Sequence, residues 1–328
     1  MRPRFAPPSR EREGEKQSGG SGGSGGGSGR EREGSKQDDT GRRGGGGWDD
    51  GGIVFVPRDP YPYSYPTRGR EPGITFTRGG HVWEVPLSAS RPAAMVRGLP
   101  GGAVRQPVRS PVWARLAFVA PPGELRWVTA ESRKPRTVVK SDWGRIGQPT
   151  WSQDDKLLAF VSDRNGSDDI YIVGEKGGKP RAIAVHPASD HSPAFASDKN
   201  WIYFVSDREG QPALWRIHIN GSPTTLTRMT GLPPGDVISV TSSRSMPSLV
   251  VCIQERKGPK QLWLYTPFAR MEAMKISDGR GDDDQPALSP DGVRVAFRTI
   301  EKESSTIIVW DRRTRRAERL TDGPDDAY

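Results

Sequence analysis

The stretch WSQDDKLLAFVSDRNGSDDIYIV at residues 151–173 is followed in the same chain by AFASDKNWIYFVSDREGQPALWRI at residues 194–217. Both contain a turn rich in Asp, an apolar strand that ends in FVS, a second turn that begins with Asp-Arg and contains Gly, and a further strand with an aromatic residue. Asp, Asn and Gly suit tight reversals because they tolerate positive φ or bond their own backbone. The duplication therefore indicates a repeat protein of short strands.

The period of the repeat comes from the apolar cluster before each second turn. These clusters end at intervals of 42, 42, 44, 48 and 45 residues, at Phe76, Phe118, Phe160, Phe204, Cys252 and Phe297. No segment of this span sustains a helical period. Four short strands per unit, in six units, predict an all-β fold, a six-bladed β-propeller of four-stranded antiparallel blades. A β-sandwich is the alternative, and the near-constant spacing disfavours it.

Composition divides the chain into three regions. Residues 1–50 hold almost no large apolar side chains and are rich in Gly, Ser, Arg and Glu, so we expect a disordered tail. Residues 51–72 are expected to form a Pro- and Tyr-rich connector with one short strand at Ile53–Val56, and residues 73–328 the propeller. The six blades are predicted at about residues 68–95, 110–139, 148–184, 192–227, 236–276 and 285–321.

The repeats resemble those of TolB-type β-propellers, which read roughly P-x-W-S-P-D-G-K-x-I-A-F-x-S-x-x-x-G-x-x-x-I-Y. The stretches WSQDDKLLAFVSDRNGSDDIYIV and QPALSPDGVRVAFR (285–298) carry the resemblance. It is strong in the third, fourth and sixth units and weak in the others. In the second unit VWAR (112–115) runs straight into LAFVA, so we expect the SPDG-like turn to be absent there.

This resemblance implies the fold and leaves two kinds of function open. TolB itself binds protein partners in the bacterial periplasm. Similar repeats form the N-terminal propellers of prolyl-oligopeptidase-type and tricorn-like peptidases and of some amidohydrolases. The sequence shows neither the separate N-terminal α/β domain of TolB nor a catalytic domain after the repeats. The ending TDGPDDAY (321–328) resembles the opening of a further unit, which either closes the ring on the first blade or marks a fragment.

The charge and hydrophobicity of the chain limit which partners and compartments we expect. The 328 residues carry a net charge of +9, but Lys and Arg are scattered among acidic residues, so we expect no nucleic-acid partner. No stretch has the run of roughly 18 apolar residues typical of a membrane span, and the N-terminus lacks the apolar core of a signal peptide. The compartment therefore stays open, although relatives are often periplasmic or secreted. The single cysteine, Cys252, excludes an internal disulfide.

Catalytic residues are not indicated by any motif. GGSGG at 19–23 formally matches G-x-S-x-G, but that motif works only between a strand and a helix, and neither is predicted there. Cys252 lies in the apolar strand SLVVCIQ and is predicted to be a buried core residue. The loop DRNGSDD (163–169) alternates oxygen ligands as a calcium loop does, but its twelfth position is Gly174, so a turn is the better interpretation.

One loop contains residues that could act as metal ligands. His186, Asp190 and His191 lie in HPASDH, between the third and fourth units. Imidazole and carboxylate groups on one loop can bind a metal, although a polar loop between blades is the favoured interpretation. We expect neither a metal nor a cofactor. The residues that we expect to carry the repeat itself are Trp151, Phe160, Asp163, Tyr171, Phe195, Phe204, Asp207, Trp215, Asp291, Gly292, Phe297 and Trp310.

Two functional hypotheses follow. The first is a non-catalytic, monomeric scaffold whose loops bind a protein, peptide or small ligand. The second is the substrate-gating propeller of a serine peptidase or amidohydrolase whose catalytic domain lies elsewhere. We favour the scaffold because no catalytic constellation is visible. The reading frame beyond Tyr328 discriminates between them, since a G-x-S-x-G domain or a His-rich barrel there would favour the hydrolase.

Overall fold

The computed structural model describes residues 53–56 and, with short gaps, residues 73–321. Residue contacts divide the chain into two units, Met1–Gly44 and Gly45–Tyr328. The predicted tail at 1–50, most of the predicted connector and the ending at 322–328 lie outside the described residues. The fold given below is that of the second unit.

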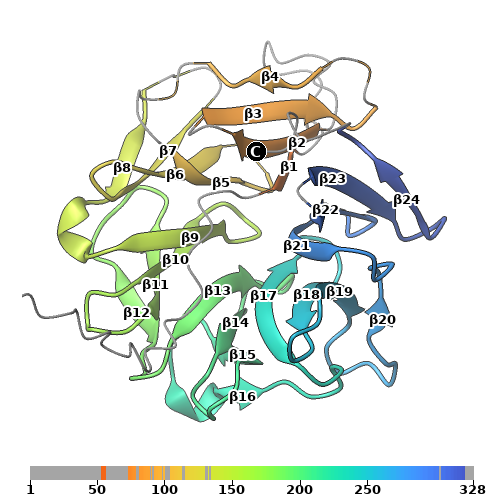
Figure 1. Cartoon of the computed structure of the whole chain (residues 1–328). Helices are drawn as coiled ribbons and strands as arrows, with labels where there is room; N and C mark the ends of the chain where they lie inside the picture. Colours follow the sequence, from red (N-terminus) through yellow and green to blue (C-terminus); the bar gives the residue numbers. More distant parts are fainter. Residues whose placement is uncertain are drawn as a thin grey trace, which may run out of the picture. The chain divides into compact units, whose positions relative to one another are not determined.

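The prediction of a six-bladed propeller is confirmed. Six four-stranded antiparallel sheets follow one another around a ring, and each is made of four consecutive strands (Figure 1). Blades 1 to 3 are β1 (Val54–Val56), β2 (Gly73–Arg78), β3 (His81–Pro86), β4 (Ala94–Met95); β5 (Arg105–Arg109), β6 (Leu116–Ala120), β7 (Glu124–Val128), β8 (Arg136–Val139); and β9 (Ile146–Trp151), β10 (Leu157–Ser162), β11 (Asp169–Gly174), β12 (Arg181–Ala184). Blades 4 to 6 are β13 (Asp190–Phe195), β14 (Trp201–Ser206), β15 (Ala213–His218), β16 (Thr227–Arg228); β17 (Asp236–Ser242), β18 (Leu249–Gln254), β19 (Lys260–Tyr265), β20 (Met274–Lys275); and β21 (Asp282–Leu288), β22 (Arg294–Glu301), β23 (Ser304–Asp311), β24 (Arg316–Arg319).

The core lies between the blades. Six clusters of buried apolar side chains each join two neighbouring blades, because the two faces of a twisted sheet are buried only by stacking. One cluster contains Ile74 and Phe76 of blade 1 together with Ala296 and Ile307 of blade 6. This contact closes the ring between the first and last blades, whose strands lie next to each other in Figure 1.

The aromatic residues of the repeat lie in these clusters. Phe160 and Phe204 occupy the second strands of blades 3 and 4 and have no exposed surface. The remaining aromatic repeat residues are also buried, and they are Trp151, Tyr171, Phe195, Trp215, Phe297 and Trp310. The turn between β21 and β22 contains Asp291, whose carboxylate accepts the Val293 N–H at 3.0 Å, and Gly292 at a φ of 72°.

The second blade has the turn that the sequence was expected to lack. The Arg115 N–H donates to Ser110 Oγ at 3.0 Å, and the Ser110 N–H donates to the Arg115 carbonyl at 2.8 Å. Ser152 makes the same pair of bonds with Leu157 in blade 3. The expectation rested on the Asp and Gly of SPDG, whereas the serine before them closes the turn.

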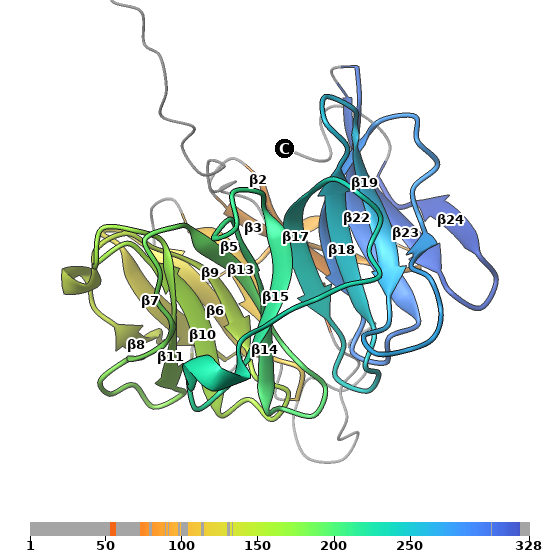
Figure 2. The same ribbon diagram turned by 90° about the horizontal axis from the view of Figure 1, so that it is seen from below.

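The strand predicted in the connector belongs to the propeller. β1 pairs with β2 in the register Val54 to Thr75 and is the innermost strand of blade 1. Likewise, β5 begins at Arg105, before the predicted start of the second blade. Figure 2 gives the view at right angles to that of Figure 1, with β13 and β17 side by side. None of the described helices, which are single 3-10 turns, has the length and apolarity to cross a membrane.

Candidate functional site

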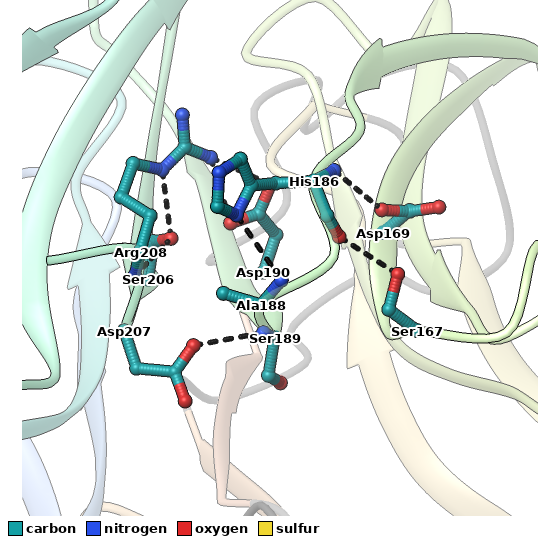
Figure 3. Close-up of polar contacts among 9 residues, drawn as sticks. All are labelled: Ser167, Asp169, His186, Ala188, Ser189, Asp190, Ser206, Asp207 and Arg208. Carbon is teal, nitrogen blue, oxygen red and sulfur yellow. Dashed lines mark hydrogen bonds and ion pairs between the residues drawn. The ribbon is translucent and has the colours of Figure 1, made fainter. Parts of the chain in front are cut away.

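The candidate site is a loop face formed where blades 3 and 4 meet. It comprises the loop 185–189 between β12 and β13, the turn 163–168 of blade 3 and the turn 207–212 of blade 4. Figure 3 shows the loop held between the two turns. Ser167 Oγ donates to the His186 carbonyl at 2.7 Å, and the Ser189 N–H donates to Asp207 Oδ1 at 2.8 Å.

A buried ion pair anchors the blade 4 side of this face. Asp190 begins β13 and has no exposed surface, and both of its oxygens lie 2.8 Å from a terminal nitrogen of Arg208. Arg208 Nε also donates to Ser206 Oγ at 2.9 Å, and its guanidinium lies 5.0 Å from the Trp215 ring. Burial raises the pKa of Asp190, and the hydrogen bonds from Ser206 and Arg208 oppose that rise. The geometry fixes the Arg208 side chain rigidly.

A second buried carboxylate anchors the blade 3 side. Asp169 begins β11, and its Oδ1 accepts the His186 N–H at 3.1 Å. The His186 Nδ1 accepts the Ala188 N–H at 3.1 Å. The loop backbone is therefore held both by Asp169 of blade 3 and by a side chain of the loop itself. Burial raises the pKa of Asp169, and the charge of Asp190 adds to that rise.

The two aspartates of the FVSDR motif have equivalent places. Asp163 Oδ1 accepts the Arg145 N–H at 2.8 Å, and Asp207 accepts the Ser189 N–H at the same distance. Each aspartate thus ties the turn of its own blade to the loop that enters that blade. Arg145 adds an ion pair with Asp168 at 3.0 Å.

Two of the three candidate metal ligands have other partners. Asp190 binds Arg208, and the His186 Nδ1 lone pair accepts the Ala188 N–H. Burial lowers the pKa of His191, and the carboxylates of Asp168 and Asp207 oppose that change. In the part of the chain that the structure describes, no group of three or more His, Cys, Asp or Glu side chains is placed to hold a metal ion.

A similar charged anchor lies between blades 5 and 6. Asp284 of β21 accepts Arg298 Nε at 2.7 Å and Lys260 Nζ at 3.2 Å. Its neighbour Asp283 accepts the Thr299 hydroxyl at 2.7 Å, and burial raises the pKa of Asp283. Residues 281–284 read GDDD, and two of these three aspartates, Asp283 and Asp284, therefore bond to other side chains of the fold.

Cys252 lies in β18 with no exposed surface, as the sequence analysis predicted. Burial raises the pKa of its thiol to about 12, and the nearby Asp284 adds to that rise. Because the thiolate is the nucleophilic form, this cysteine is chemically inert in the folded protein.

A relay of side chains around the inner strands was not anticipated from the sequence. Gln106 Oε1 accepts the Gln148 N–H at 2.6 Å, Gln148 Oε1 accepts the Ser192 N–H at 2.6 Å, and Ser192 Oγ accepts the Val240 N–H at 3.0 Å. Gln106, Gln148 and Ser192 have φ values of 51°, 48° and 53°. Each precedes a proline within a β-bulge, where a residue without an N–H is tolerated. The Gln-Pro or Ser-Pro dipeptide that recurs in these blades is the feature of the sequence that could have indicated the relay.

Comparisons with known proteins agree with this geometry. A family model described as the TolB beta propeller domain matches residues 105–326. A Tol-Pal system protein TolB of Bordetella parapertussis is 30% identical over 274 residues, which covers 66% of this chain and 59% of that protein. The uncharacterized peptidase YuxL of Bacillus subtilis is 25% identical over 155 residues, which covers 47% of this chain and 22% of the peptidase.

Solved structures show the same fold. TolB from Acinetobacter baumannii superposes with a TM-score of 0.60 at 16% identity, over 84% of this chain and 65% of that structure. The chain spans about half the length, or less, of several other curated relatives that it matches. Because the family model covers more than half of the chain, including blades 2 to 6, this protein belongs to the TolB β-propeller domain family.

Proposed function

We propose that this propeller is a non-catalytic binding scaffold whose loop face takes a protein or peptide partner. The observation that carries the proposal is the bonding of loop 185–189 shown in Figure 3. A loop whose backbone is already fixed loses little conformational entropy when a partner binds. At the start of this loop Val185 is 55% exposed, which offers an apolar contact within a rigid polar frame.

Two further observations support a scaffold. The one cysteine of the chain is buried, with its pKa raised to about 12, and so is no nucleophile. Two relatives are named as TolB proteins of the Tol-Pal system, and these names favour a protein partner here.

The test is site-specific photo-crosslinking from the full chain. A photoreactive residue at position 185 is expected to capture one protein partner. The same residue at Met271, which is 78% exposed in the loop between β19 and β20, is the matched control and is expected to capture none. The purified partner should then bind the Val185→Glu variant roughly tenfold more weakly, as the loss of a buried apolar contact predicts. Equal capture from both positions would refute the proposal.

The gating propeller of a hydrolase is the second candidate function. The similarity to a Bacillus subtilis peptidase over 47% of this chain favours it. The polypeptide expressed from the native locus provides the test. A catalytic domain on that polypeptide, with hydrolysis of aminoacyl substrates, would support this function and replace the scaffold proposal.

A further inference from the structure

The outer rim of blade 6 carries a dense group of arginines. Residues 311–319 read DRRTRRAER, with five arginines against two acidic residues, and form the end of β23, its turn and β24. We call residues 311–319 the arginine rim. All four residues of β24 are exposed, and β24 lies at the outside of the ring in Figure 1.

The acidic residues of this segment do not neutralise its arginines. The Asp311 carboxylate pairs with Arg294 at 3.6 Å and accepts the N–H groups of Arg313 and Thr314. Among the described residues, no carboxylate lies within ion-pair distance of four of the arginines, which are Arg313, Arg315, Arg316 and Arg319. The rim therefore presents unneutralised positive charge to solvent.

The backbone of β24 also offers a free edge. This strand pairs with β23 on one side and with no other described strand. The Leu320 N–H donates inward to the Ile307 carbonyl at 2.8 Å. Because N–H directions alternate along an antiparallel strand, those of Ala317 and Arg319 point outward. Unpaired outward groups of this kind are a template for a further strand.

The other outermost strands differ from β24. β4, β16 and β20 have two residues each, and β8 and β12 bury half of their residues. Of the six described outer strands, β24 is the one that combines four residues with complete exposure. The free edge and the unpaired arginines are independent observations that coincide on it.

We propose that the arginine rim binds an acidic, extended peptide segment of a partner protein, which adds to β24 as a fifth strand of blade 6. Main-chain hydrogen bonds to an open edge supply affinity, and Arg–carboxylate pairs supply specificity. A second copy of this chain does not fit, because two arginine rims would repel one another. Nucleic acid is disfavoured because the rim has no aromatic side chain on which a base could stack. The proposal uses no residue of the loop face and does not depend on the function proposed for it.

Binding of a labelled peptide that alternates glutamate and valine to the full chain tests the proposal by fluorescence anisotropy. Ala317→Pro removes one outward N–H at a position where an edge strand tolerates proline, and should weaken binding roughly fivefold. Ala317→Val keeps that N–H and should bind as the wild type does. The double change Arg316→Glu with Arg319→Glu should weaken binding roughly tenfold or more.

Three results would overturn the proposal. The first is the absence of binding by the wild-type chain. The second is an equal loss in a control with Lys176→Glu and Lys257→Glu, exposed lysines on other blades, because net charge would then explain the binding. The third is preferential binding of single-stranded DNA or phosphatidylserine vesicles to the rim. Circular dichroism of each variant confirms that the fold is kept.

Discussion

Single side chains decide how firmly the loop face is held. Asp190 begins the inner strand of blade 4 and Arg208 follows the second strand, so the hairpin brings them into an ion pair with side-chain exposures of 0% and 10%. Asp154 and Lys156, by contrast, form a pair in which the lysine is 77% exposed. A buried pair depends on both partners, because removing one leaves the other charged without a counterion, whereas an exposed pair is screened by water.

We therefore expect Asp190→Ala to lower the free energy of unfolding by roughly 3–5 kcal/mol, since Arg208 would stay buried without its partner. Lys156→Ala is the matched control and should cost less than about 1 kcal/mol. Urea denaturation of both variants measures the two values. Equal costs would show that the Asp190 pair is as well solvated as the surface pair.

The thiol of Cys252 makes a second prediction at this scale. With its pKa raised to about 12, the thiolate is nearly absent at pH 8, and the side chain has no exposed surface. A disulfide reagent at pH 8 should therefore leave the native protein unlabelled and should react with one thiol per chain in guanidinium chloride. Rapid labelling of the native chain at a rate independent of denaturant would contradict this burial.

At the scale of the strand, the structure matches the prediction wherever a local sequence pattern carries the information. The strands of blades 3, 4 and 6 follow from apolar runs between Asp- and Gly-rich turns. The turn at Ser110 was not predicted because it lacks the Asp and Gly of SPDG, although Ser110 precedes Ser152 by one period. The Asp190–Arg208 pair was missed because it depends on the register of β13 against β14, which places Asp190 opposite Ser206. The Gln148 relay was missed because it joins neighbouring blades, and no local pattern reports which side chains meet there.

The side-chain relay through Gln148 leads to a testable prediction about strand stability. Gln148→Ala keeps the Cβ at the positive-φ bulge but removes the acceptor of the Ser192 N–H. A backbone donor left without a partner costs about 1–3 kcal/mol, so the midpoint of urea denaturation should fall accordingly. Gln148→Glu keeps an acceptor oxygen at the same place on the side chain and should cost less. A similar cost for both variants would show that the bulge itself matters and the relay does not.

For the whole molecule, the closure of the ring is the property that sequence left open. The repeat predicted six blades but not the partner of the first. The strand predicted at Ile53–Val56 was placed in a connector because a long Pro-rich segment follows it. In the structure, blades 1 and 6 share a buried cluster like those within the ring. A closed ring should unfold in one transition, because every blade then has two neighbours.

Matched substitutions on the two kinds of interface test this closure. Ile74 lies between blades 1 and 6, Ile202 lies between blades 3 and 4, and neither has any exposed surface. Replacing either by Ala removes the same buried methyl and methylene groups, and each should cost about 2–5 kcal/mol in one cooperative transition. If the ring opened readily at the first blade, Ile74→Ala would leave the main transition of the full chain unchanged while Ile202→Ala lowered it. Calorimetry therefore separates a closed ring from an open one, since in the closed ring a defect at the junction weakens all six blades together.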